Sequence, residues 1–148
     1  GGAIRLINSE LNIEGESKVK FNENKSEISN GGAISSLCSN INISENSDVE
    51  FSGNEAAFGG AISSRCVCGK NINISGNSKV KFIRNKAFEN KMESQNESII
   101  MTGYGGAIYT SNEKGIYVLD NAYVEFIKNE ALSGGAIYSE LYDNLELH

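Results

Sequence analysis

Two tetrapeptides alternate along this chain of 148 residues, and the repeat constrains the fold more than any other feature. Gly-Gly-Ala-Ile occurs five times and Phe-x-x-Asn occurs four times, always in turn. The copies of the first motif are Gly1, Gly2, Ala3 and Ile4; Gly31, Gly32, Ala33 and Ile34; Gly59, Gly60, Ala61 and Ile62; Gly105, Gly106, Ala107 and Ile108; and Gly134, Gly135, Ala136 and Ile137. The copies of the second are Phe21 and Asn24, Phe51 and Asn54, Phe82 and Asn85, and Phe126 and Asn129. A period of roughly thirty residues is typical of solenoid proteins, in which each repeat forms one structural unit.

Two further apolar steps stand between the tetrapeptides, in the same register in every repeat. The first step is Leu11 and Ile13, Ile41 and Ile43, Ile72 and Ile74, and Ile116 and Val118. The second is Val-x-Phe, whose valines are Val19, Val49, Val80 and Val124. An apolar residue at every second position predicts a strand with one buried face, and the Gly, Asn and Ser residues between the steps predict turns. Each repeat therefore predicts three short strands.

Three strands in about thirty residues predict one turn, or rung, of an all-β fold, the right-handed parallel β-helix. We expect four to five rungs, at approximately 1–30, 31–58, 59–104, 105–133 and a partial rung at 134–148. The rungs form a single domain, 1–148, which we expect to be a fragment of a longer protein. Leucine-rich repeats fit less well because no segment has helical periodicity, and a β-propeller needs four strands in about forty residues.

The charged residues offer an independent test of stacking. Beside the inward Val and Phe, successive repeats carry Lys20, Glu50, Lys81 and Glu125. Equivalent residues of a parallel stack lie about 4.8 Å apart, where opposite charges stabilise neighbouring strands and like charges destabilise them. The alternating signs are those that stacking in register would favour.

We interpret both tetrapeptides first as structural. Their Ile and Phe side chains are expected in the core, and their glycines are expected at tight corners where backbones approach closely. The Asn of Phe-x-x-Asn falls at a corner, where Asn tolerates the left-handed conformation and can bond to neighbouring backbone. Stacked corner asparagines then predict a hydrogen-bonded ladder along the solenoid.

The third repeat departs from the pattern. The segment between Phe-x-x-Asn and the next Gly-Gly has nineteen residues there, 86–104, and four to six elsewhere. An insertion at a corner leaves the core intact, and loops on a rigid scaffold often carry function. Two interpretations of this segment stay open: it is an insertion that the fold tolerates, or it is a loop that contacts a partner.

The chain has three cysteines, Cys38, Cys66 and Cys68. Cys38 and Cys66 each follow the Ile of their motif by four residues, so stacking places them on adjacent rungs, at a spacing that suits a disulfide. Cys68 can compete, so a Cys38–Cys66 and a Cys38–Cys68 bond are both open in an oxidising compartment. We expect no metal site and no cofactor, because His148 is the only histidine and paired cysteine sets are missing.

Composition and charge exclude several classes of function. A net charge of -6 without a basic cluster argues against nucleic acid, and no apolar run reaches the roughly 20 residues that a membrane-spanning helix needs. We therefore expect no direct membrane insertion. The outward acids Asp48, Glu50 and Glu125 alternate with lysines rather than grouping as an acid–base pair, so we expect no enzyme.

The alternation of Gly-Gly-Ala-Ile with Phe-x-x-Asn resembles the chlamydial polymorphic membrane proteins, and the resemblance covers essentially the whole chain. It implies a β-helical autotransporter passenger, displayed on the extracellular face of the outer membrane or secreted, that acts as an adhesin on host cells. It also implies that the tetrapeptide residues named above take part in adhesion, that the partner is a host cell-surface protein, and that disulfide cross-linking is common in the family.

Two functions of different classes follow as hypotheses. The first is an adhesin that binds a receptor on host cells. The second is a structural stalk that associates with itself, because the ends of such a solenoid expose unpaired strand edges.

Overall fold

The structure is a computed structural model that describes residues 1–27, 29–66, 69–89, 102–112 and 115–140. All regular elements in these ranges are short strands, and they form three main parallel sheets. Sheet A contains β1 (Ile4–Ile7), β4 (Ile34–Leu37), β8 (Ile62–Cys66), β12 (Ile108–Asn112) and β15 (Ile137–Ser139). Sheet B contains β2 (Glu10–Ile13), β5 (Asn40–Ile43), β9 (Ile72–Ile74) and β13 (Ile116–Val118). Sheet C contains β3 (Lys18–Asn22), β6 (Asp48–Ser52), β10 (Lys79–Ile83) and β14 (Tyr123–Ile127).

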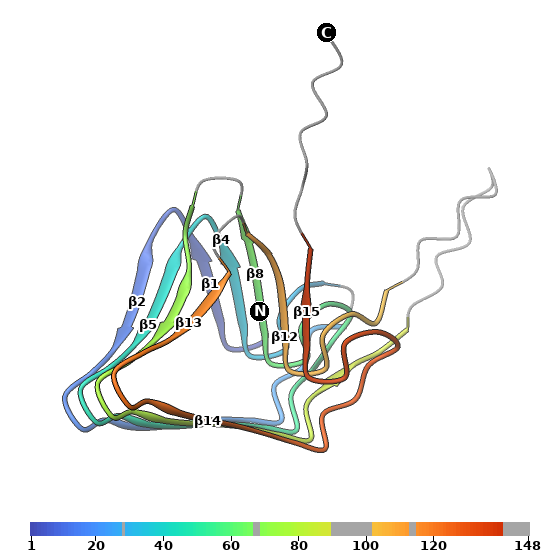
Figure 1. Ribbon diagram of the computed structural model, residues 1–148. Helices are drawn as coiled ribbons and strands as arrows, with labels where there is room; N and C mark the ends of the chain where they lie inside the picture. Colours follow the sequence, from blue (N-terminus) through green and yellow to red (C-terminus); the bar gives the residue numbers. More distant parts are fainter. Residues whose placement is uncertain (28, 67–68, 90–101, 113–114, 141–148) are drawn as a thin grey trace, which may run out of the picture.

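Each of the first four rungs contributes one strand to each sheet, the last adds β15 to sheet A, and equivalent strands lie side by side along the stack (Figure 1). In sheet A the register aligns Ile4 with Ile34, Ile34 with Ile62, and Ile62 with Ile108. In sheet C it aligns Phe21, Phe51, Phe82 and Phe126. The predicted solenoid of parallel strands, with three strands in a rung, is confirmed.

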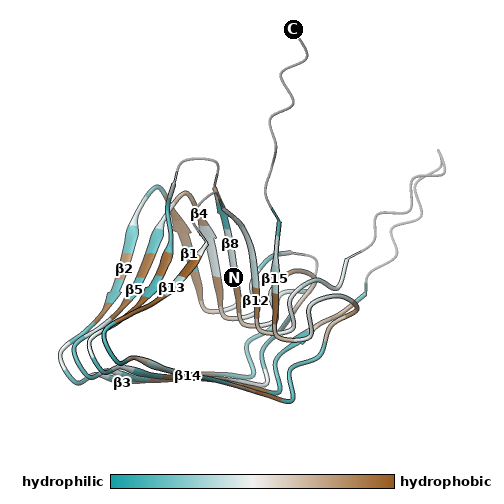
Figure 2. Cartoon of the chain, in the orientation of Figure 1, coloured by the Kyte–Doolittle hydropathy of each residue, from teal (hydrophilic) through white to brown (hydrophobic). Residues whose placement is uncertain are grey.

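The core runs along the axis of the stack and is built from columns of identical side chains. Neighbouring rings of the Phe column lie 4.8, 4.9 and 5.0 Å apart between centroids and are nearly parallel. Alternating apolar and polar positions are visible along β2 and β5 (Figure 2), and the Ile of sheets A and B face the same interior as the Phe rings. Burying each such side chain stabilises the fold by roughly 1.5–3 kcal/mol, so the period-two pattern sets both the strands and the core.

The charge column has the predicted register, but it is not where the ion pairs form. Lys20, Glu50, Lys81 and Glu125 are aligned on neighbouring strands of sheet C. Among the described residues, ion pairs within 4 Å instead join Lys25 to Glu55 at 3.6 Å and Lys86 to Glu130 at 3.7 Å. The sheet C charges therefore act across neighbouring strands at longer range, where water weakens them.

The sequence did not predict a fourth stacked segment, which begins directly after each Phe-x-x-Asn. Two residues of consecutive rungs pair there as β7 (Glu55–Ala56) and β11 (Lys86–Ala87), and isolated bridges extend the pairing to Lys25 and Glu130. No apolar alternation marks a segment of two residues, so period-two analysis cannot detect it.

Candidate functional site

The Asn corners are joined by a continuous side-chain ladder. Asn24 Nδ2 donates to Asn54 Oδ1 at 2.8 Å, Asn54 Nδ2 donates to Asn85 Oδ1 at 2.8 Å, and Asn85 Nδ2 donates to Asn129 Oδ1 at 3.0 Å. Each Oδ1 also accepts the backbone N–H of the Asn in the preceding rung, at 3.0 Å. The second N–H of the amide reaches back to the carbonyl of the preceding Phe position, as Asn54 does to Phe21 at 2.8 Å. The predicted ladder is confirmed.

One detail of that prediction is wrong, because the Asn does not adopt the left-handed conformation. The residue before it does: Glu23, Gly53, Arg84 and Lys128 have φ between 50° and 62°. The turn is made one residue earlier, and this leaves the Asn free to aim its amide at the next rung. Four different residue types occupy this left-handed position, so the sequence has no repeated residue that marks it.

The Gly-Gly corners work by the absence of side chains. Gly59 has φ +62°, and a Cβ placed on it would lie 1.9 Å from the Ile62 carbonyl oxygen. A Cβ on Gly60 would lie 2.1 Å from the Gly106 carbonyl oxygen of the next rung. The first glycine is therefore needed within its own turn, and the second is needed between rungs, as the sequence predicted.

The central copies of both tetrapeptides are inside the molecule. The residues 31–34, 59–62 and 105–108 are buried, and so are Phe51, Asn54, Phe82 and Asn85. The two end copies, 1–4 and 134–137, are exposed or half-buried. The buried copies hold the corners together and offer no side chain for contact with another protein, and the adhesive role of the motif residues stays a prediction.

The ends of the long segment 86–104 are part of the stack. Lys86–Ala87 forms β11, and Phe88 N–H donates to the Ala56 carbonyl at 2.9 Å. At the other end, Gly103 N–H donates to the Ala57 carbonyl at 2.8 Å, and Thr102 Oγ1 donates to the Phe88 carbonyl at 3.2 Å. The two ends therefore lie side by side, and residues 90–101 between them lie outside the described residues.

Four aromatic rings, three of them half-buried and one (Tyr109) buried, lie together beside these ends. Phe58 stacks on Tyr104 with centroids 5.8 Å apart and contacts Tyr109 at 5.2 Å. Tyr138 contacts Tyr104 at 4.6 Å and Tyr109 at 6.0 Å, and the Tyr109 hydroxyl is hydrogen-bonded to Glu140. Since Phe58 and Tyr104 occupy positions held by Asn30 and Ser133 in other rungs, repeat analysis gave no signal for this aromatic group.

Two of the cysteines meet on adjacent rungs. Cys38 Sγ lies 2.6 Å from Cys66 Sγ, at the end of the paired strands β4 and β8. Cys38 has a free thiol, whereas Cys66 is disulfide-bonded, so neither of the two bonds predicted for Cys38 is formed here. Cys68, the other predicted partner of Cys38, lies outside the described residues, and the connectivity in solution stays a prediction.

The described part of the chain contains no candidate metal cluster and no candidate membrane-spanning helix. No three His, Cys, Asp or Glu side chains are grouped there as they would be around a metal ion. No helix in that part has the length and apolar character to cross a bilayer.

The comparison with known families agrees with this architecture. The model of the Chlamydia polymorphic membrane protein repeat matches residues 48–65, 71–111 and 123–140, together more than half of the chain. Each matched stretch contains one Phe-x-x-Asn and the Gly-Gly-Ala-Ile that follows it. The chain belongs to the chlamydial polymorphic membrane protein family. No curated protein and no solved structure gives a match. Membership of this family suggests a passenger of an autotransporter at the outer membrane surface. The match itself does not show an adhesive role.

Proposed function

We propose that this chain is a stretch of an adhesin passenger, exposed on the bacterial surface, that binds a protein receptor on host cells. The observation that carries the proposal is the family match, which falls on three successive pairs of the two tetrapeptides. A solenoid with buried motif corners supports it physically, because stacked rungs form a rigid support on which outward residues and excursions keep fixed positions.

The contact surface on this proposal is the side of the stack where the 86–104 segment leaves and returns. The segment is fixed at both ends by backbone hydrogen bonds to Ala56 and Ala57. Beside it lie the half-buried rings of Phe58, Tyr104 and Tyr138. Aromatic side chains are enriched where proteins recognise one another, since they bury much area at a small entropic cost.

Beads coated with the chain test the proposal on cultured epithelial cells. Beads with the native chain should attach and should compete with the intact bacterium for the cell surface. A variant in which a Gly-Ser pair replaces residues 90–101 should lose attachment while it keeps its β circular dichroism, because residues 88, 102 and 103 already hold the ends together.

The matched control is a variant with the same Gly-Ser pair inserted after Gly15, an exposed turn where a Cβ would meet nothing within 4 Å. This control should attach as the native chain does. Native beads that attach no better than beads coated with a scrambled sequence would contradict the adhesin proposal. Equal loss in both variants would contradict the placement of the contact surface.

A structural stalk is the second candidate, and the last strands of sheets A and B favour it. Val118 and Ile137 occupy inward columns of the stack, yet they are 47% and 40% exposed there. Their strands, β13 and β15, are edge strands of sheets B and A. Exposed edges of this kind are templates for pairing with another chain. Size-exclusion chromatography over a concentration series decides, since a stalk should form oligomers without attaching to cells.

A further inference from the structure

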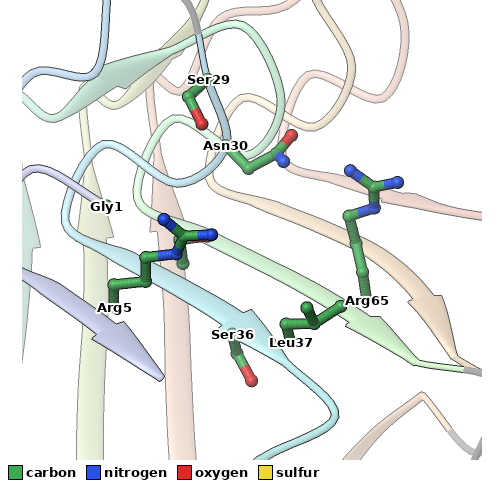
Figure 3. A pocket seen from close by; sticks show the side chains of 8 residues that line it. Gly1, Arg5, Ser29, Asn30, Ser36, Leu37 and Arg65 are labelled. Carbon is green, nitrogen blue, oxygen red and sulfur yellow. The ribbon is translucent and has the colours of Figure 1, made fainter. Parts of the chain in front are cut away.

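A hollow on the outer face of sheet A gathers cationic and hydrogen-bonding side chains. It is lined by Arg5 of β1, Leu37 of β4 and Arg65 of β8, and by Ser29 and Asn30 of the segment that precedes the Gly31 corner. The chain has three arginines, and two of them are here. Both arginines are exposed, and Figure 3 shows their side chains on opposite sides of the hollow, below Ser29 and Asn30.

The register explains how the two arginines come together. Arg5 is aligned with Ser35, and Arg65 is aligned with Leu37, two residues further along the same strand β4. Residues two apart on a strand point to the same face, so both arginines project outward from sheet A. Strand spacing and rise place their Cα atoms roughly 12 Å apart. The two guanidinium groups thus frame the hollow rather than forming one cluster.

The charge of these arginines is not neutralised by neighbours. The described residues that line the hollow include no acidic side chain, and in that part of the chain neither guanidinium has a carboxylate within 4 Å. A local positive field persists here on a chain whose net charge is -6.

We propose that this hollow binds an acidic oligosaccharide, with one carboxylate or sulfate group held by each of Arg5 and Arg65. Guanidinium groups suit this chemistry because their planar donors match the oxygens of both anions. The hydroxyl and amide groups of Ser29, Asn30 and Ser35 supply partners for sugar hydroxyls, and the exposed Leu37 supplies an apolar surface for a sugar ring.

An acidic peptide fits the same charges less well. Peptides commonly add a strand to a free sheet edge or anchor apolar side chains in a groove. The middle strand of the lining, β4, is paired on both sides, with β1 and with β8, so a peptide could add a strand only at the outer edge of β1, beside Arg5 and away from Arg65. Among the described residues of the lining, Leu37 is the one apolar side chain.

Direct binding measurements on the whole chain test the site. The probes are a heparin-derived hexasaccharide for sulfate, an oligomer of sialic acid for carboxylate, neutral maltohexaose, and a glutamate decapeptide. At least one acidic sugar should bind, maltohexaose should not, and binding should weaken as salt is raised. Arg5→Gln and Arg65→Gln should each weaken that binding about tenfold, since each removes a charge-assisted contact.

Arg84→Gln is the matched control, because it removes the same charge from the third arginine, which lies near Glu23 and Gly53 on another face. It should change affinity by less than about twofold. All three arginines are exposed, so circular dichroism should show native folds. Absence of binding to both acidic sugars, an equal loss with Arg84→Gln, or tighter binding of the decapeptide would overturn the proposal.

This inference adds a ligand class to the proposed adhesin but is tested apart from it. If the chain binds the sugar and the coated beads do not attach, the adhesin proposal fails alone. If beads carrying the double variant of Arg5 and Arg65 attach normally and the purified chain binds no sugar, the oligosaccharide site fails alone.

Discussion

The two kinds of corner solve the same problem in opposite ways. At the Asn corner a side chain crosses from rung to rung, and Asn54 alone donates to or accepts from groups of Asn24, Phe21 and Asn85. At the Gly-Gly corner the backbones of successive rungs bond directly, as Gly60 N–H does to the Gly105 carbonyl at 3.0 Å, and there is no room for a side chain. The Asn corner therefore depends on the Asn side-chain amide, and the Gly-Gly corner depends on the absence of a Cβ. The two should respond differently to substitution.

The largest effect is expected from Gly59→Ala, with Gly53→Ala as its matched control. Both glycines have φ +62°, so both variants carry the same left-handed strain of about 1–2 kcal/mol. A Cβ at Gly53 has its nearest neighbour at 3.5 Å, in the Glu23 side chain, whereas at Gly59 it meets backbone at 1.9 Å. Gly59→Ala should cost more than about 4 kcal/mol or prevent folding. Urea unfolding followed by circular dichroism measures both, and equal costs would show that strain, not space, defines the Gly-Gly corner.

Phe51→Ala should cost about 3–5 kcal/mol, because it empties the middle of the Phe column. Its ring is fully buried and stacks on both neighbours, at 4.8 and 4.9 Å. Phe126→Ala in the end rung, where the ring is half-buried and stacks on Phe82, should cost less. Similar losses in the free energy of unfolding would mean that the end rung is as well packed as the centre, contrary to the burial seen here.

Asn54→Ala sharpens the comparison at the other corner. It removes the amide that bridges two rungs and leaves the buried Phe21 carbonyl without its Asn54 donor, so a loss of about 1–3 kcal/mol is expected. Asn129→Ala, at the half-buried last position of the described ladder, should cost less. If both variants unfold at the native denaturant concentration, the ladder does not stabilise the stack.

The smallest effect is expected from Glu50→Lys on the outer face of sheet C. The new lysine would stand between Lys20 and Lys81, at a cost of up to about 1 kcal/mol. Because the site is solvated, about 1 M salt should remove most of the loss. Glu125→Lys, which is paired with Lys81 on one side, should cost about half as much. A loss unaffected by salt would point to packing rather than charge.

Much of the fold could be predicted because one register runs through the whole chain. The Phe column, the parallel sheets and the Asn ladder each follow from positions that repeat with the same residue type. The left-handed position before each Asn could not be predicted in this way, since Glu, Gly, Arg and Lys occupy it in turn. The boundaries of the 86–104 excursion also needed the structure, because β11 and Thr102 continue the stack without any repeated motif.

The candidate site was beyond repeat analysis for a physical reason. Arg5 and Arg65 occupy different columns, two residues apart along the strand, so no comparison of equivalent positions would pair them. The aromatic group could not be predicted for a related reason, since Phe58 and Tyr104 stand where other rungs have polar residues. Both features set single rungs apart from the repeat, and both include side chains that reach solvent.

The corner ladder also has a direction, and this restricts the symmetry of any assembly built on it. In each of its three Asn–Asn links, the Nδ2 of one rung donates to the Oδ1 of the next rung toward the C-terminus. One end of the solenoid thus presents an amide oxygen and the other presents an amide N–H. Copies that join head to tail would continue the ladder, while a two-fold contact between like ends would set donor against donor or acceptor against acceptor. Self-association through the ends would therefore yield polar filaments in preference to closed dimers.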